Sequence, residues 1–209
     1  MQAKPAPEPP TMRERYRAQV RDEVKQAALR QLAESGPALY RYFASRDELL
    51  TELVIDAYRD LAHALSEAAR RAPGPQPRAQ LGDLARAYRS WALAQPHRYR
   101  LLFGPPLPGY DAHAQRLVEA AQASMKVLLG VLRELGDRAA TPPAEPLASQ
   151  LLALAQVHGR GIDAAMALRA IIIWSRLHGL VSLEIAGNFA SMGIDPGLVF
   201  EAELVTLTA

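Results

Sequence analysis

The side chains with the clearest chemical potential lie in one run of sixteen residues, Ser35 to Leu50. Leu39 and Phe43 are four positions apart, which places them on one face of a short helix that can dock on its neighbours. Side chains that can point hydroxyls and a guanidinium outward at phosphates lie beside them: Tyr40, Arg41 and Tyr42. The pattern indicates non-covalent recognition of an anionic backbone, because phosphate contacts of this kind position a protein on nucleic acid.

Two helix-start signals would hold this run in place. Ser35 can cap a short helix, and Pro37 suits the first turn, where its missing N–H is not needed. Ser45, followed three residues later by Glu48, forms a capping box that opens a second, longer helix. Arg46 in the first turn of that helix opposes the helix dipole unless an anion lies nearby. We therefore expect a short helix, a tight bend and a long helix.

This run closely resembles the recognition-helix signature of the tetracycline-repressor (TetR) family of bacterial regulators. In that family a Leu-Tyr-x-His/Tyr-Phe run ends the DNA-reading helix, and Ser/Asn-Lys/Arg-x-x-Leu begins the next helix. The matching positions here are Leu39, Tyr40, Tyr42, Phe43, Ser45, Arg46 and Leu49. An ordinary solvated helix corner is the alternative for any one of these residues, but the whole ordered run favours DNA recognition.

The resemblance implies a set of DNA-binding residues, which are Ser35, Gly36, Pro37, Ala38, Tyr40, Arg41, Tyr42 and Arg46. Two tyrosines and an arginine would contact backbone phosphates and so position the helix, namely Tyr40, Tyr42 and Arg46. The residues closest to base edges would be Gly36, Pro37, Ala38 and Arg41.

One part of the family pattern is missing between the first helix and this run. TetR-type chains place a second helix there, but here Ala33 and Glu34 lead directly into Ser35. A helix-turn-helix needs both helices. The uninterrupted sequence favours a true deletion of about one helix, whereas the intact recognition run favours a segment omitted from the recorded sequence. We favour omission, and the mass of the intact protein decides between the two.

Composition sets wider limits on the class of protein. The chain has 209 residues, 49% of them hydrophobic and 22% charged, as in a soluble globular protein. The absence of cysteine excludes disulfides and thiolate metal sites. The most apolar stretch, 171–185, contains charged residues, and no apolar leader opens the chain. We therefore expect a cytoplasmic protein without a membrane span.

The charge is unevenly distributed along the chain. Residues 1–46 carry nine Lys or Arg against five Asp or Glu, and this positive excess suits a segment that approaches nucleic acid.

The apolar periodicity predicts an all-α fold. Helices are expected over residues 12–34, from Arg46 to about 71, and over 78–94, 97–103, 111–135 and 147–158, from Asp163 to about 187, and over 196–207. Residues 1–10 are rich in Pro and Ala and are expected to form a disordered arm. We assign 11–56 to a DNA-binding domain and 57–209 to a domain for effector binding and dimerisation.

A second resemblance covers the back half of the chain. Trp174, His178 and Gly179 match the Trp-x-x-x-His-Gly (WHG) signature of one C-terminal domain class of the same family, and the run 98–110 resembles that class as well. In the family, helices corresponding to about 147–160 and 163–187 pack against their copies in a homodimer. The apolar residues on nearly every face of 171–185 favour such an interface independently. The expected interface residues are Leu151, Leu154, Ile172, Ile173 and Leu180.

The family binds small molecules inside its C-terminal bundle, in pockets that are mostly apolar with a few polar groups. The candidates here are Trp91, Tyr99, Phe103, Tyr110, Met125, Trp174 and His178. Each of them has the alternative interpretation of ordinary core packing. The histidines show no paired metal spacing, and the sequence has neither a P-loop nor a GxGxxG or nucleophile motif. We expect no catalytic residue, no cofactor and no metal.

These observations predict a ligand-responsive transcriptional regulator, acting as a repressor that binds a palindromic DNA operator as a homodimer. The alternative is a dimeric helical protein that binds a ligand or a partner and no longer binds DNA. Neither the effector, the operator nor the regulated genes follow from the sequence.

Overall fold

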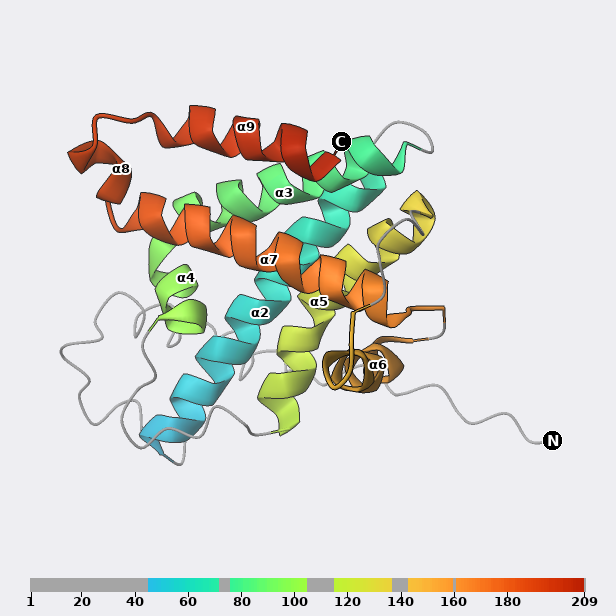
Figure 1. Cartoon of the computed structure of the whole chain (residues 1–209). Helices are drawn as coiled ribbons and strands as arrows, with labels where there is room; N and C mark the ends of the chain where they lie inside the picture. The colour runs from blue at the N-terminus through green and yellow to red at the C-terminus, as the bar shows by residue number, and fades with distance from the viewer. Residues whose placement is uncertain (1–44, 72–75, 105–114, 137–142, 160, 209) are drawn as a thin grey trace. The chain divides into compact units, whose positions relative to one another are not determined.

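The computed structural model describes residues 45–71, 76–104, 115–136, 143–159 and 161–208. Within these ranges the chain is helical and contains no strand, which confirms the predicted all-α fold (Figure 1). The helices are α2 (Arg46–Arg71), α3 (Pro77–Ala94), α4 (Pro96–Phe103), α5 (Gln115–Leu135), α6 (Leu147–His158), α7 (Ala164–Ile185), α8 (Asn188–Ser191) and α9 (Pro196–Thr208). The arm, the first helix, the gap after Glu34 and residues 35–44 of the recognition run lie outside the described residues.

The chain divides into two compact units, residues 1–53 and 54–209. The division lies three residues before the domain boundary assigned from the sequence. Helix α2 belongs to both units, since it runs without interruption from Arg46 to Arg71.

Helix α2 begins where the capping box predicts. The Ser45 hydroxyl accepts a hydrogen bond from the Glu48 N–H at 3.1 Å, and the Ser45 carbonyl accepts one from the Leu49 N–H at 3.2 Å. These bonds satisfy amide groups that the first turn would otherwise leave without partners. The helix ends at Arg71, as its periodicity predicts, with Arg70 and Arg71 in the last turn, where positive charge complements the dipole.

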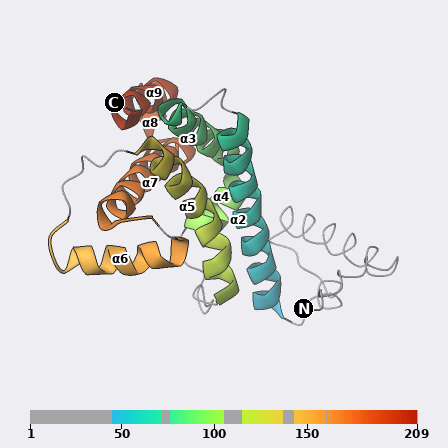
Figure 2. The same cartoon turned by 90° about the vertical axis from the view of Figure 1, so that its right-hand side faces the viewer.

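Helix α7 is the element around which the second unit is built. It packs against α3, α5, α6, α8 and α9. Figures 1 and 2 show α3 and α9 on one side of α7 and α6 on the other. The core that these helices share with α2 contains Leu61, Leu81, Leu84, Tyr88, Leu128, Leu132, Ile173, Leu177 and Phe200. This core fixes the walls of the cavity described below.

Helix α7 begins at the cap that the sequence predicts, but within the single chain only one face of the helix is buried. The Asp163 carboxylate accepts a hydrogen bond from the Met166 N–H at 2.8 Å and so caps the helix. One face is buried through Ala167, Ile173 and Val181, whereas Ile172 is 45% exposed. Because α7 is apolar on both faces, a single chain leaves one apolar face uncovered. By length and composition alone α7 could also cross a membrane, but core helices of soluble proteins pass the same test, so this is weak evidence.

Charged pairs fasten α9 and α7 to α3. Arg89 forms two hydrogen bonds with the Glu184 carboxylate, at 2.8 and 2.6 Å, and its guanidinium lies 5.3 Å from the centre of the Phe200 ring. Arg86 makes a similar two-bond pair with Glu201 at 3.0 and 2.8 Å. Paired geometry of this kind gives arginine–carboxylate contacts orientation as well as energy.

The junction of α3 and α4 is tied to α2 through Asp60. One oxygen of the Asp60 carboxylate accepts hydrogen bonds from the Trp91 indole at 2.9 Å and the Arg98 guanidinium at 2.7 Å. The Gln95 amide donates to the same oxygen at 3.3 Å. We call these four residues the Asp60 cluster. Gly104 ends α4 where a side chain would collide with the chain, because a Cβ there would lie 2.3 Å from the Arg100 carbonyl oxygen.

Candidate functional site

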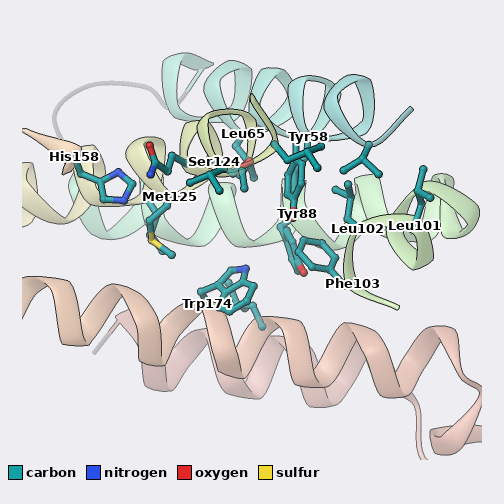
Figure 3. Close-up of a pocket in the computed structure, with 18 of the residues that line it drawn as sticks. Tyr58, Leu65, Tyr88, Leu101, Leu102, Phe103, Ser124, Met125, His158 and Trp174 are labelled. Carbon is teal, nitrogen blue, oxygen red and sulfur yellow. The ribbon is translucent and has the colours of Figure 1, made fainter. Parts of the chain in front are cut away.

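The second unit contains a cavity of about 650 Å³, within the range of roughly 300–1,000 Å³ that is usual for small-molecule sites. Its walls come from α2, α3, α4, α5, α6 and α7 (Figure 3). The lining residues are Val54, Tyr58, Leu61, Leu65, Leu84, Tyr88, Leu101, Leu102, Phe103, Gly104, Leu117, Val118, Ala121, Gln122, Ser124, Met125, Leu128, Leu154, His158, Trp174 and Leu177. Most of them are apolar, and none is Asp, Glu, Lys or Arg.

Aromatic rings form one part of the wall. Tyr58 of α2 meets Phe103 of α4 edge to face, with ring centres 6.3 Å apart. Phe103 in turn lies 6.1 Å from the ring of Trp174 on α7. These contacts join three helices through their rings, which favours a wall of defined shape.

The polar part of the lining comes mainly from α5 and α6. Ser124 on α5 has a buried hydroxyl oxygen with no hydrogen-bond partner among the described residues. His158, the last residue of α6, is only 8% exposed. Burial lowers the pKa of His158, and the charge of Lys126 lowers it further. The imidazole is therefore neutral at physiological pH, with one nitrogen that donates and one that accepts.

The two ends of the cavity differ in character. Figure 3 shows His158 and Met125 toward one end, with Ser124 on the same side of the aromatic rings. Leu101 and Leu102 lie toward the other end. The cavity is thus polar at one end and apolar at the other.

The structure separates the candidate pocket residues into two groups. Phe103, Met125 and Trp174 line the cavity. Three others are not part of its lining: Trp91 and Tyr99 are buried in the surrounding core, and His178 is partly buried. Tyr110 falls in 105–114, outside the described residues.

Hydrogen bonding explains why these three side chains stay out of the cavity. The Trp91 indole donates to Asp60 and so belongs to the Asp60 cluster. The Tyr99 hydroxyl lies 2.9 Å from the Nδ1 atom of His178 and donates to the His178 carbonyl at 3.2 Å. The Tyr88 hydroxyl lies 3.4 Å from the same nitrogen, and the Trp174 ring stacks on the imidazole at 5.4 Å. We call Tyr88, Tyr99 and His178 the His178 cluster, which joins α3, α4 and α7.

Several lining residues were missed from the sequence: Tyr58, Tyr88, Gln122, Ser124 and His158. For Ser124 a signal was present. It lies seven residues after Leu117 and three after Ala121, on the apolar face that predicts α5. A hydroxyl on such a face needs a partner or a function.

The residues proposed for a dimer interface lie at different depths in the single chain. Ile172 is exposed, whereas Leu151 and Ile173 are buried and Leu180 is partly buried. Leu154 lines the cavity. Other large apolar side chains on α6 and α7 are exposed in the single chain, namely Leu152, Val157 and Leu183.

The described residues include little of the predicted DNA-binding site. All of the predicted DNA-contacting residues except Arg46 lie outside them, and Arg46 is placed only by its backbone, as the first residue of α2. Among the described residues, no group of three His, Asp or Glu side chains is arranged to hold a metal ion.

Comparison with known proteins gives the context of this cavity. Residues 81–207 match the family described as tetracyclin repressor-like, C-terminal domain. The HTH-type transcriptional regulator Rv1816 of Mycobacterium tuberculosis (strain ATCC 25618 / H37Rv) is 34% identical over 189 residues, which cover 88% of this chain and 81% of the relative. The HTH-type transcriptional regulator Mb1846 of Mycobacterium bovis (strain ATCC BAA-935 / AF2122/97) matches with the same identity and coverage.

Solved structures agree with this assignment. The crystal structure of SCO4313, a protein described as regulatory, superimposes with a TM-score of 0.77 at 40% identity, over 94% of this chain and 98% of that one. A protein from Rhodococcus sp. RHA1 shares the fold, with a TM-score of 0.62 at 22% identity over 95% of this chain and 94% of that one. The chain therefore belongs to the tetracycline-repressor-like family of helix-turn-helix transcriptional regulators.

Proposed function

We propose that this regulator is a ligand-responsive repressor that binds a palindromic operator as a homodimer in the cytoplasm and catalyses no reaction. Residues 11–56 would form the DNA-binding domain and 57–209 the domain for effector binding and dimerisation. The observation that carries the proposal is the course of α2. Val54, Tyr58, Leu61 and Leu65 of this helix line the cavity, and its first residue, Arg46, belongs to the predicted recognition run.

A ligand can change DNA affinity only if it binds two conformations of the protein unequally. A molecule in the cavity would contact α2 and α4 together. The proposed effect is to favour a dimer whose recognition helices are wrongly spaced for successive major grooves, which are about 34 Å apart. The repressor would then release its operator.

The uncovered apolar side chains of α6 and α7 support the homodimer. Leu152, Val157, Ile172 and Leu183 are each more than a third exposed. A two-fold interface uses the same patch on both subunits, so these side chains would cover one another. Replacing Ile172 and Leu183 by Asp is expected to give a monomer in analytical ultracentrifugation, whereas the same change at the exposed, polar Ser149 is not.

A mobility-shift titration with genomic fragments over a range of salt concentrations tests the DNA-binding part. A repressor shows an affinity that falls steeply with salt and keeps a preference for one palindrome. Tyr40→Phe is expected to weaken binding to all sequences alike, since it removes a proposed phosphate contact. A loss confined to the operator would contradict that backbone role. Failure to bind any fragment at low ionic strength would favour the alternative of a helical ligand-binding protein that no longer reads DNA.

A further inference from the structure

We propose that the cavity takes an uncharged, mostly apolar molecule whose one hydrogen-bonding group, a hydroxyl or a carbonyl, contacts Ser124 and His158. The inference rests on the proposed function, because it takes the cavity to be the effector site. It adds the chemical class of the effector and the end of the cavity at which its polar group binds.

The lining excludes a charged ligand on energetic grounds. None of its side chains is permanently charged, and the lysine that influences His158, Lys126, is exposed and outside the lining. A carboxylate or an ammonium in this cavity would lose its hydration and gain only neutral partners. Burying an unpaired charge in that way is far more costly than burying a neutral polar group.

The polar end of the cavity offers a complementary pair of groups. The buried Ser124 hydroxyl oxygen has no partner among the described residues. The largely buried His158 ring lines the cavity toward the same end. A neutral imidazole and a hydroxyl can each donate and accept. A ligand hydroxyl placed between them could therefore accept from one and donate to the other. Since buried polar groups in proteins are nearly always paired, a Ser124 hydroxyl without a partner among the described residues indicates a ligand that pairs it, with His158 as the neighbouring polar group.

The remaining, mostly apolar lining of the cavity determines what the apolar part of the ligand can be. Tyr58, Phe103 and Trp174 supply rings along its middle, and Leu101 and Leu102 close the end away from His158 (Figure 3). An apolar body that extends from the polar end past the rings would bury its surface there, at about 25 cal/mol per Å² of apolar area removed from water. A medium-length alkyl alcohol has this form and serves as a probe.

The test compares three probes that share one chain and differ in their head groups: 1-decanol, decanoate and decylammonium. Binding to the full chain is measured by isothermal titration calorimetry. We expect 1-decanol to bind at least about tenfold more tightly than either ion, since the cavity holds no opposite charge. Equal or tighter binding of decanoate or decylammonium would overturn the inference, and so would a failure of 1-decanol to bind up to its solubility limit.

Two variants locate the head group. Ser124→Ala and His158→Leu are each expected to weaken 1-decanol binding about three- to tenfold, the range for one hydrogen bond. Matched control variants are Ser149→Ala and His63→Leu, since both side chains are exposed and outside the lining. Ligand-free Ser124→Ala should unfold at the same temperature as the parent or slightly higher, which a merely structural role of the hydroxyl would not produce. Unchanged 1-decanol affinity in both variants would contradict the proposed contact.

A parallel mobility-shift assay on the same samples separates this inference from the proposed function. Intact binding of a genomic palindrome without 1-decanol binding would overturn the ligand class alone. Binding of 1-decanol with no affinity for DNA would overturn the repressor proposal and leave the ligand class in place.

Discussion

Two histidines in the C-terminal unit share a lowered pKa and differ in their surroundings. Burial lowers the pKa of both His158 and His178, so both are neutral at physiological pH. His178 has its Nδ1 atom close to two tyrosine hydroxyls and its ring stacked on Trp174, whereas no hydrogen bond to the His158 ring is found among the described residues. His178 thus has hydrogen-bond partners within the fold, whereas His158 lies on the cavity wall.

This difference separates a structural role from a binding role. A buried polar group that is paired within the fold holds helices together, and removing it leaves its partners without hydrogen bonds. A buried polar group without a partner in the fold adds no hydrogen bond to the stability of the protein, and it can pair with a ligand instead. The His178 cluster and the pair formed by Ser124 and His158 are thus expected to respond in opposite ways to substitution.

The largest difference is expected between two matched variants, His178→Leu and His158→Leu. His178→Leu leaves the Tyr88 hydroxyl without its imidazole partner, while Tyr99 keeps the His178 backbone carbonyl. The free energy of unfolding should fall by about 1–3 kcal/mol, since two buried hydroxyls lose a shared hydrogen-bond partner. His158→Leu should change it by less than about 0.5 kcal/mol, because no partner is lost. Denaturant unfolding measures both free energies. Equal losses of stability in the two variants would contradict the proposed difference between the two histidines.

The Asp60 cluster extends the comparison to a third polar group. Asp60 accepts from Trp91, Gln95 and Arg98, so it is paired within the fold as His178 is. Asp60→Asn removes the charge but keeps one acceptor, and we expect it to lower the free energy of unfolding by about 1–2 kcal/mol. Asp83→Asn on the exposed side of α3 is the control. No loss at Asp60 would show that pairing alone does not identify structural groups here.

Acid pH should act on both histidines in the same direction. Burial lowers the folded-state pKa of each below the ordinary value of 6.5. The unfolded chain therefore takes up protons first as the pH falls, and stability that is present above about pH 6.5 is lost below it. Unfolding measured between about pH 8 and pH 5 should show a smaller loss in His178→Leu than in the parent protein. An equal loss of stability in the variant and the parent protein would mean that groups other than His178 cause the acid sensitivity.

The smallest effect is expected at Ser124. Its hydroxyl has no partner among the described residues, so Ser124→Ala should leave the free energy of unfolding within about 0.5 kcal/mol of the parent value. A loss as large as that of His178→Leu would mean that the hydroxyl is paired within the fold. It would then be unavailable to a ligand.

Local rules predicted the helices and their ends because caps and proline signals act over a few residues. Ser45, Asp163 and Pro196 mark the starts of α2, α7 and α9 as the sequence indicates. Helix α8 was missed because four residues carry too little periodicity to register.

The cavity was only partly predictable because pairing of side chains depends on tertiary packing. Tyr99 and His178 have the residue types of pocket groups, yet they hydrogen-bond to each other and do not line the cavity. Helix α7 has apolar residues on all its faces, so its sequence could not show which face stays exposed in the single chain. Ile172 lies on that face, whereas its neighbour Ile173 is buried.

The account depends most on the chain reading one DNA sequence as a pair of subunits. The direct measurement is the affinity of material with verified intact mass for genomic palindromes, titrated at several salt concentrations. The account predicts strong preference for one palindrome and an affinity that falls steeply as salt rises. Equal, weak affinity for every fragment at low ionic strength would contradict it.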